Sequence, residues 1–251
     1  VVQWQGQEPP GSPTLASRLP LEMKTGDRLI VSLDRYAQAY STLDFEADEG
    51  STLTLEYGQT FRSSGNALGG SYNHINRYTA KAGRQTYVSA DTFGCKFIAL
   101  QVTGGHIKLF GLNLTNRLYP FDVKGAFACD DAFLNKLWPL GVHTIQTCSE
   151  DAYVDCATRE RTEWLADAVM VAHPISDLTL AGPAAQPGGE PSWGDPRLFG
   201  SLLRHIGQSA LPDGRVKARH PSDFMDIHGY IEDYACLWIQ GLRTWHDRTG
   251  D

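Results

Sequence analysis

The sequence predicts a multidomain β + α fold class, with an antiparallel β-sandwich followed by a helical region. Between Asp27 and about Asn116, short runs alternate every two residues, are enriched in β-branched and aromatic residues, and are separated by Gly, Asn and Ser clusters. After Tyr119-Pro120 the apolar residues instead recur at helical spacing. We therefore expect a β-sandwich domain over residues 1–120 and a helical domain over residues 121–251.

The β-domain contains five clear strand patterns. They cover residues 28–33, 51–57, 85–90, 96–103 and 106–114. Turn-forming residues separate the strands, including Ser63-Ser64-Gly65-Asn66 and Gly104-Gly105. Because short alternating strands must bury one face, an antiparallel sandwich is the expected packing.

The helical region starts where Asp130-Asp131 is suited to cap a helix. Pro139 should kink or split that helix. Further helices are expected over about residues 160–173, 197–209 and 230–248. Four or five helices beside a β-sandwich make a poor closed unit, so we expect a fragment of a longer polypeptide. A small helical sub-bundle packed on the sheet is the alternative.

Composition narrows the classes of partner. The net charge is -7 and the sequence has no block of Lys or Arg, which argues against binding to nucleic acid or to an anionic membrane. No run approaches the roughly 20 apolar residues needed to span a bilayer. The five cysteines form no CxxC pair and the histidines show no metal-ligand spacing, so neither a metal nor another cofactor is expected. Neutral partners fit better, and the compartment stays open.

The densest polar chemistry lies in residues 155–167, which carry four acids, two arginines and a tryptophan. Glycoside hydrolysis needs one protonated carboxylic acid for the leaving oxygen, together with further carboxylates that bind sugar hydroxyls and stabilise positive charge on the ring. Trp164 offers a flat apolar face for a sugar. On the residues alone the segment is ambiguous, because an acidic helix start with exposed Arg-Glu neighbours is also common.

An ordered set of motifs resolves this ambiguity. The run Tyr153-Val154-Asp155-Cys156 is followed by Arg159-Glu160-Arg161, by Trp164 and by Asp167-Ala168. Further along come Pro212-Asp213-Gly214-Arg215-Val216 and a helix ending in Thr249-Gly250-Asp251. From about Leu43 onward the chain resembles the bacterial α-L-rhamnosidase family, glycoside hydrolase family 78 of the six-hairpin glycosidase superfamily. The resemblance implies that residues 121–251 form the first helices of an (α/α)6 barrel, which is incomplete in this chain.

The resemblance also assigns roles to five residues. Glu160 corresponds to the general acid. Asp155 and Asp167 correspond to carboxylates that hold rhamnose hydroxyls, while Arg159 and Trp164 would line the pocket. The implied partner is a rhamnose-containing glycoside or polysaccharide.

The family inverts configuration, so a second glutamate is expected to act as general base. The resemblance implies that this base lies downstream of Asp251, in the remainder of the catalytic domain of the same parent protein. The chain alone is therefore expected to be inactive. The motif in this chain differs from the family's usual sequence at Ala157-Thr158 and at Leu165-Ala166, which leaves the aglycone preference open.

Several alternatives remain beside this reading. Glu163 rivals Glu160 as proton donor, because on a helix the two would share nearly one face. His220, Asp226 and His228 are either substrate contacts or a solvated loop. At the level of function, the alternatives are a polysaccharide lyase or unsaturated-uronide hydrolase on the same scaffold, or a non-catalytic carbohydrate-binding fragment. A lyase would need a Tyr or His base and a cation near a uronate carboxyl.

Overall fold

The computed structural model describes residues 2–3, 14–62, 67–70, 74–181, 196–222 and 229–251. The chain divides into two compact units, Val1–Arg117 and Leu118–Asp251. The expected turn at residues 63–66 lies outside the described residues. That the first unit is a sandwich domain and the second the start of a barrel stays a proposal.

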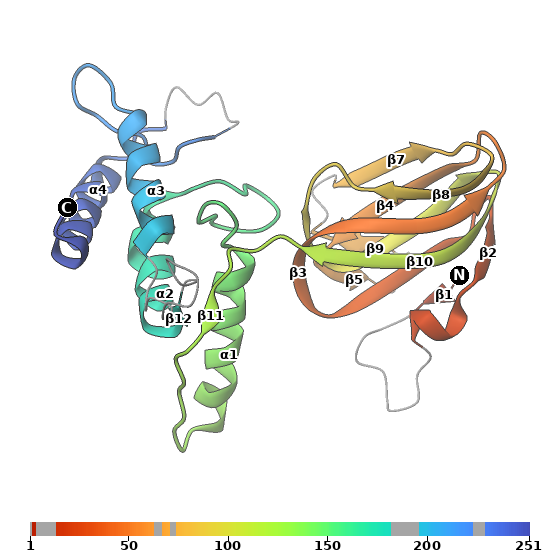
Figure 1. Ribbon diagram of the computed structural model, residues 1–251, viewed down its shortest axis with the longest axis horizontal. Helices are drawn as coiled ribbons and strands as arrows, with labels where there is room; N and C mark the ends of the chain where they lie inside the picture. The colour runs from red at the N-terminus through yellow and green to blue at the C-terminus, as the bar shows by residue number, and fades with distance from the viewer. Residues whose placement is uncertain (1, 4–13, 63–66, 71–73, 182–195, 223–228) are drawn as a thin grey trace, which may run out of the picture. The chain divides into compact units, whose positions relative to one another are not determined.

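The first unit is built from an eight-stranded sheet in the order β2-β10-β3-β9-β4-β7, with β1 and β8 also pairing with β3 (Figure 1). The strands are β1 (Val2–Gln3), β2 (Leu21–Lys24), β3 (Arg28–Ala47), β4 (Thr52–Gly58), β7 (Ile75–Thr79), β8 (Gly83–Val88), β9 (Phe93–Gly104) and β10 (His106–Asn116). A hairpin of β5 (Thr60–Arg62) and β6 (Ala67–Gly69) and a 3-10 helix (Leu15–Arg18) complete the unit. The expected antiparallel sheet is confirmed, since all these pairs except β1 with β3 run antiparallel.

The 20-residue strand β3 organises the sheet by changing partner along its length. Its first part pairs with β9 as far as Ala39, and its second part pairs with β10 and β8 as far as Ala47. The register shifts between Ser32 and Ala37, where the strand bends. Leu29 from the first part and Phe45 from the second belong to one buried cluster, so the two halves of the sheet share a core.

The second unit contains the expected helices. They are α1 (Ala132–Thr147), a π-helical segment (Asp167–Ala172) that continues into α2 (His173–Thr179), α3 (Pro196–Gln208) and α4 (Glu232–Thr249), with a short pair of β11 (Asp122–Val123) and β12 (Leu180–Ala181). The carboxylate of Asp131 accepts hydrogen bonds from the amide N–H groups of Phe133 and Leu134, and this is the N-cap that the sequence predicts. Pro139 lies inside α1 without splitting it.

The helix expected to begin near Glu160 begins later, so that boundary was wrong. Residues 160–163 are irregular, and Trp164 forms a β-bridge with Arg219 before the helical stretch starts at residue 165. The physical reason lies in the backbone hydrogen bonds: the amide of Leu165 donates to the carbonyl of Ala218, a partner distant in sequence, instead of to the preceding turn.

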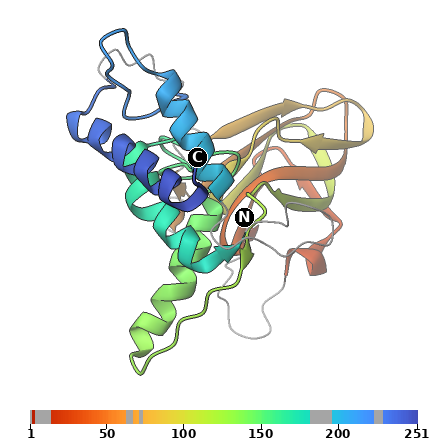
Figure 2. The ribbon, with the colours of Figure 1, turned by 60° about the vertical axis from the view of Figure 1, so that its left-hand side comes forward.

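Helices α3 and α4 lie against each other through small residues (Figures 1 and 2). A Cβ on Gly200 would lie 2.5 Å from the ring of Trp245, and one on Gly241 would lie 2.7 Å from Leu203. These glycines let the two backbones approach and bury the apolar face of α3, including Leu202 and Ile206. In the described part of the chain, none of the helices combines the length and apolar character of a membrane span.

Candidate active site

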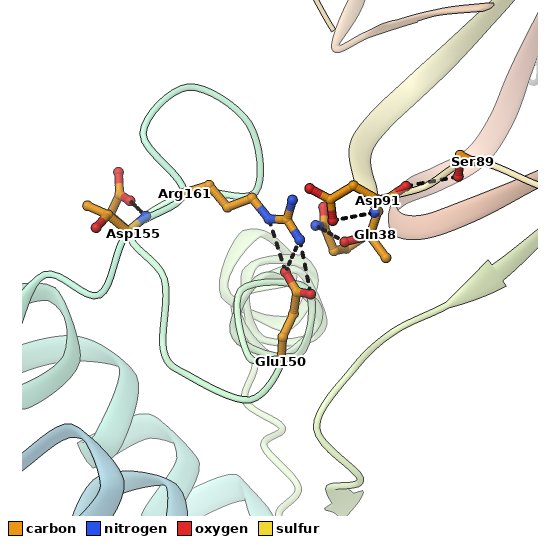
Figure 3. A network of polar contacts seen from close by, with 8 residues as sticks. Gln38, Ser89, Asp91, Glu150, Asp155 and Arg161 are labelled. Atoms are coloured by element: carbon orange, nitrogen blue, oxygen red, sulfur yellow. Dashed lines mark hydrogen bonds and ion pairs between the residues drawn. The ribbon is translucent and has the colours of Figure 1, made fainter. Parts of the chain in front are cut away.

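The signature, residues 153–168, starts in the loop after α1 and ends in the π-helical segment, and two contacts close that loop. The guanidinium of Arg161 binds both carboxylate oxygens of Glu150 at 3.1 and 3.2 Å (Figure 3). Glu150 is buried, so this bidentate pair is shielded from water. Asp155 and Thr162 form two hydrogen bonds, each 3.1 Å long. The amide of Asp155 donates to the carbonyl of Thr162, and the amide of Thr162 donates to Oδ1 of Asp155. Arg161 adopts φ 47°, and the Glu150 pair stabilises this unusual backbone.

Glu160 is held at both oxygens. The indole Nε1 of Trp164 donates to Oε2 of Glu160 at 2.7 Å, and the guanidinium of Arg159 pairs with Oε1. A second cation, Nη1 of Arg219, lies 3.9 Å from Oε2. The side chain of Glu160 is 19% exposed and that of Arg159 is 60% exposed. The carboxyl group is therefore mostly shielded from bulk water, with one partner in solvent and two partners in the protein.

Trp164 lies between two further side chains. The guanidinium of Arg219 stacks 4.5 Å from the centroid of its indole ring, within cation–π range. Tyr234 from α4 meets the same ring edge-on, with centroids 5.9 Å apart. These contacts fix the plane of the indole and hence the direction of its N–H group toward Glu160.

Three carboxylates of the signature share one electrostatic environment. The pKa of Asp167 is raised by partial burial and, further, by the negative charges of Asp155 and Glu160. The pKa of Tyr234 is raised by burial and then by Asp167, Asp233 and Glu160. The structure thus brings Asp155, Glu160 and Asp167 close enough to interact.

Glu163 does not join this group. Its side chain is 2% exposed, and its Oε2 lies 2.7 Å from Nδ1 of His205 on α3. Burial raises the pKa of Glu163 to about 7, although the hydrogen bond and charge of His205 act in the opposite direction. The expectation that Glu160 and Glu163 share one helical face was wrong, because neither residue is in a helix and their side chains have separate partners.

Sequence reasoning missed three residues at or beside the site: Arg219, Tyr234 and His205. Arg219 and Tyr234 are 55 and 70 residues away from Trp164 along the chain, so no local spacing indicates them. Of the loop residues considered earlier, His220 is half-buried, with a pKa lowered by burial and then by the charges of Lys217 and His205. Asp226 and His228 lie outside the described residues.

Comparison with known proteins gives the signature a family context. Residues 122–178 match the family model of the bacterial alpha-L-rhamnosidase six-hairpin glycosidase domain. The resemblance to the bacterial α-L-rhamnosidase family is thereby confirmed. The matched stretch contains the five residues to which the resemblance assigns roles in this rhamnosidase-like chain. A search of curated proteins found no match.

Solved rhamnosidases share the fold of this rhamnosidase-like chain. The family 78 rhamnosidase of Bacillus sp. GL1 superposes with a TM-score of 0.75 at 24% identity, over 89% of this chain and 22% of its own. A rhamnosidase from Klebsiella oxytoca with rhamnose bound gives 0.75 at 17% identity, over 96% and 48%. The Streptomyces avermitilis α-L-rhamnosidase complexed with L-rhamnose gives 0.57 at 13% identity, over 90% and 24%. The chain thus spans less than half of each of these proteins.

Proposed function

We infer that this chain contributes the acid side of the active site to an inverting glycoside hydrolase that cleaves terminal α-L-rhamnosides. The observation that carries the proposal is the placement of Glu160, a shielded carboxyl group bonded to Trp164 and within electrostatic reach of Asp167. This is the environment that protonation of a glycosidic oxygen requires: one positioned acid beside further carboxylates.

In the proposed reaction Glu160 gives its proton to the leaving oxygen as the bond to the sugar breaks. Asp155 and Asp167 accept hydrogen bonds from sugar hydroxyls and stabilise the positive charge that develops on the ring. Trp164 and Arg159 line the pocket. Water attacks from the opposite face, activated by a glutamate base that we place in the remainder of the catalytic domain of the same parent protein.

The substrate class follows from the family resemblance. Two of the similar proteins are named as rhamnose complexes, and we propose that a rhamnose-containing glycoside or polysaccharide binds at Glu160 here. The compartment and the aglycone are left open.

A lyase is the runner-up, because Tyr234 and Arg219 supply a tyrosine and a cation beside the signature. The raised pKa of Tyr234 argues against it, since a base for proton abstraction is more effective when its pKa is lowered toward neutrality. Elimination leaves an ultraviolet-absorbing double bond in the product, whereas hydrolysis does not. Such absorbance in the product would overturn the hydrolase proposal.

The test compares Glu160→Gln with Glu163→Gln in the full-length parent protein on an aryl α-L-rhamnoside. We expect Glu160→Gln to lower kcat by about 100-fold or more, because general acid catalysis contributes about 10²–10⁴-fold. The Glu163→Gln protein should retain most of its activity, and the product sugar should first appear with inverted configuration by proton NMR. Loss confined to Glu163→Gln refutes the assignment. Equal activity of the isolated 251-residue chain and its parent would refute the proposed downstream base.

A further inference from the structure

Arg219 is placed beside the candidate acid by the backbone rather than by chance contact of a surface side chain. Arg219 forms a β-bridge with Trp164, and the carbonyl of the neighbouring Ala218 accepts a hydrogen bond from the amide of Leu165 at 2.9 Å. The amide of Ala218 in turn donates to the carbonyl of Gly229 at 2.7 Å. The strand-like segment at residues 218–219 is therefore fixed on both sides, and Arg219 projects from it.

The side chain of Arg219 touches both partners of the central hydrogen bond. Its guanidinium covers the ring of Trp164 at 4.5 Å, while its Nη1 lies 3.9 Å from the same Oε2 of Glu160 that the indole N–H binds. Only 11% of the Arg219 side chain is exposed, so this charge is poorly screened by water. The distance of 3.9 Å exceeds hydrogen-bond length, which leaves Trp164 as the donor to Oε2.

The two arginines around Glu160 therefore differ in their exposure to solvent. Arg159 is mostly in solvent and binds Oε1, so it can be displaced when a substrate arrives. Arg219 is mostly buried, and its Nη1 lies close to Oε2. When Glu160 gives up a proton from Oε1, its carboxylate becomes negative, and a nearby cation that is mostly shielded from water stabilises that charge as it develops.

We propose that Arg219 is a positioning residue for the acid step: it holds Trp164 against Glu160 and stabilises the carboxylate left after proton transfer. The proposal rests on the proposed function for its catalytic part. In that step the proton leaves Oε1 of Glu160 and joins the glycosidic oxygen, the bond from this oxygen to the sugar carbon breaks, and the aglycone departs as an alcohol.

The kinetic test uses the full-length parent protein with Arg219→Met, which keeps an unbranched apolar stem but removes the charge, and Arg219→Lys, which restores a cation. Substrates are a 2,4-dinitrophenyl rhamnoside, whose leaving group needs little protonation, and an alkyl rhamnoside, whose leaving group needs it. We expect Arg219→Met to lose about 10–100-fold in kcat on the alkyl substrate but less than about threefold on the dinitrophenyl substrate. KM should change little, and Arg219→Lys should recover part of the loss.

Arg215→Met is the matched control. Arg215 lies four residues before Arg219 and also stacks on an aromatic ring, at 5.0 Å from the centroid of Tyr230, but its side chain is 63% exposed and paired with Asp213. It should behave as wild type on both substrates. A merely structural role for Arg219 would lower both rates by the same factor, and that outcome, like no loss at all, overturns the proposal.

A second measurement separates this proposal from the proposed function. Hydrogen exchange of the Trp164 indole N–H is followed by NMR, with its signal assigned by its absence in Trp164→Phe. We expect Arg219→Met to speed this exchange by about tenfold or more, because the ring loses the cation that covers it; Arg215→Met should not change it. If the wild type cleaves no rhamnoside, the proposed function fails while this exchange rate still decides for or against Arg219. An unchanged rate overturns the positioning role.

Discussion

Glu163 makes the stability of the second unit depend on pH. Its pKa is about 7 in the folded protein, above the ordinary value of 4.5, because burial disfavours the charged form. A raised pKa means that the folded state binds a proton more tightly than the unfolded state. The stabilisation is therefore complete below about pH 4.5 and is lost as the pH rises through 7.

The substitution Glu163→Gln should remove this dependence, because the amide stays neutral and can still accept a hydrogen bond from His205. We expect the variant to match wild type in free energy of unfolding near pH 4.5 and to be more stable by roughly 1–3 kcal/mol at pH 8. Urea unfolding at several pH values measures this difference. Asp130→Asn, a loss of charge at an exposed position of the same unit, is the control. A difference that stays constant with pH would contradict the assignment.

At the scale of elements, the packing of α3 on α4 depends on a missing side chain. A Cβ at Gly200 would lie 2.5 and 2.6 Å from ring atoms of Trp245, so the indole or its helix must shift to admit it. Gly200→Ala should therefore destabilise the unit by about 1–2 kcal/mol, since overpacking outweighs the gain of about 1 kcal/mol in helix propensity. Thermal unfolding measures the change.

Gly141 is the natural comparison, because it lies inside α1 with nothing within 4 Å of the position of an added Cβ. The same change to Ala should there stabilise the protein by about 0.5–1 kcal/mol through helix propensity alone. If both alanine substitutions shift the unfolding temperature in the same direction, the close contact at Gly200 does not determine how tightly α3 packs on α4.

The elements that the sequence predicts well are those set by local periodicity. The alternation at residues 96–103 and 106–114 falls within β9 and β10, and the apolar spacing after Asp131 gives α1. The expected strand at residues 28–33 is longer in the structure and continues to Ala47 as β3. The charged pair Asp34-Arg35 interrupts the alternation where the strand bends, so the local pattern indicates a strand end there. Local pattern cannot show that a bent strand continues with new partners.

For the candidate site too, the sequence could predict the residues that are close together along the chain but not the distant one. Asp155, Glu160, Trp164 and Asp167 lie within 13 residues, so the sequence could group them, and the structure brings them together. Their roles rest on the family resemblance and stay predictions. Arg219 could not be found, because its contact with Trp164 depends on a β-bridge between segments separated by many residues. The helix start at Glu160 was misplaced for the same reason.

At the scale of the whole molecule, the outer face of α1 is apolar and open. Phe133, Leu137 and Leu140 are 69%, 46% and 60% exposed, respectively. Leu137 and Phe127 also line an apolar groove that continues to Ile175. Exposed apolar residues that lie together favour association with other apolar surfaces. We propose that the remainder of the catalytic domain covers this face in the parent protein.

This proposal predicts that one pair of substitutions acts with opposite sign in two polypeptides. In the 251-residue chain, Phe133→Lys with Leu140→Lys should lower binding of the dye ANS and self-association by about half or more, because the apolar face is exposed there. In the parent protein the same pair should reduce stability by about 2–5 kcal/mol, because two charges would be buried without partners. Val88→Lys, at a 54% exposed position of β8, is the control and should do neither. If the pair is neutral in the parent protein, this face of α1 stays in water there, and the proposal fails.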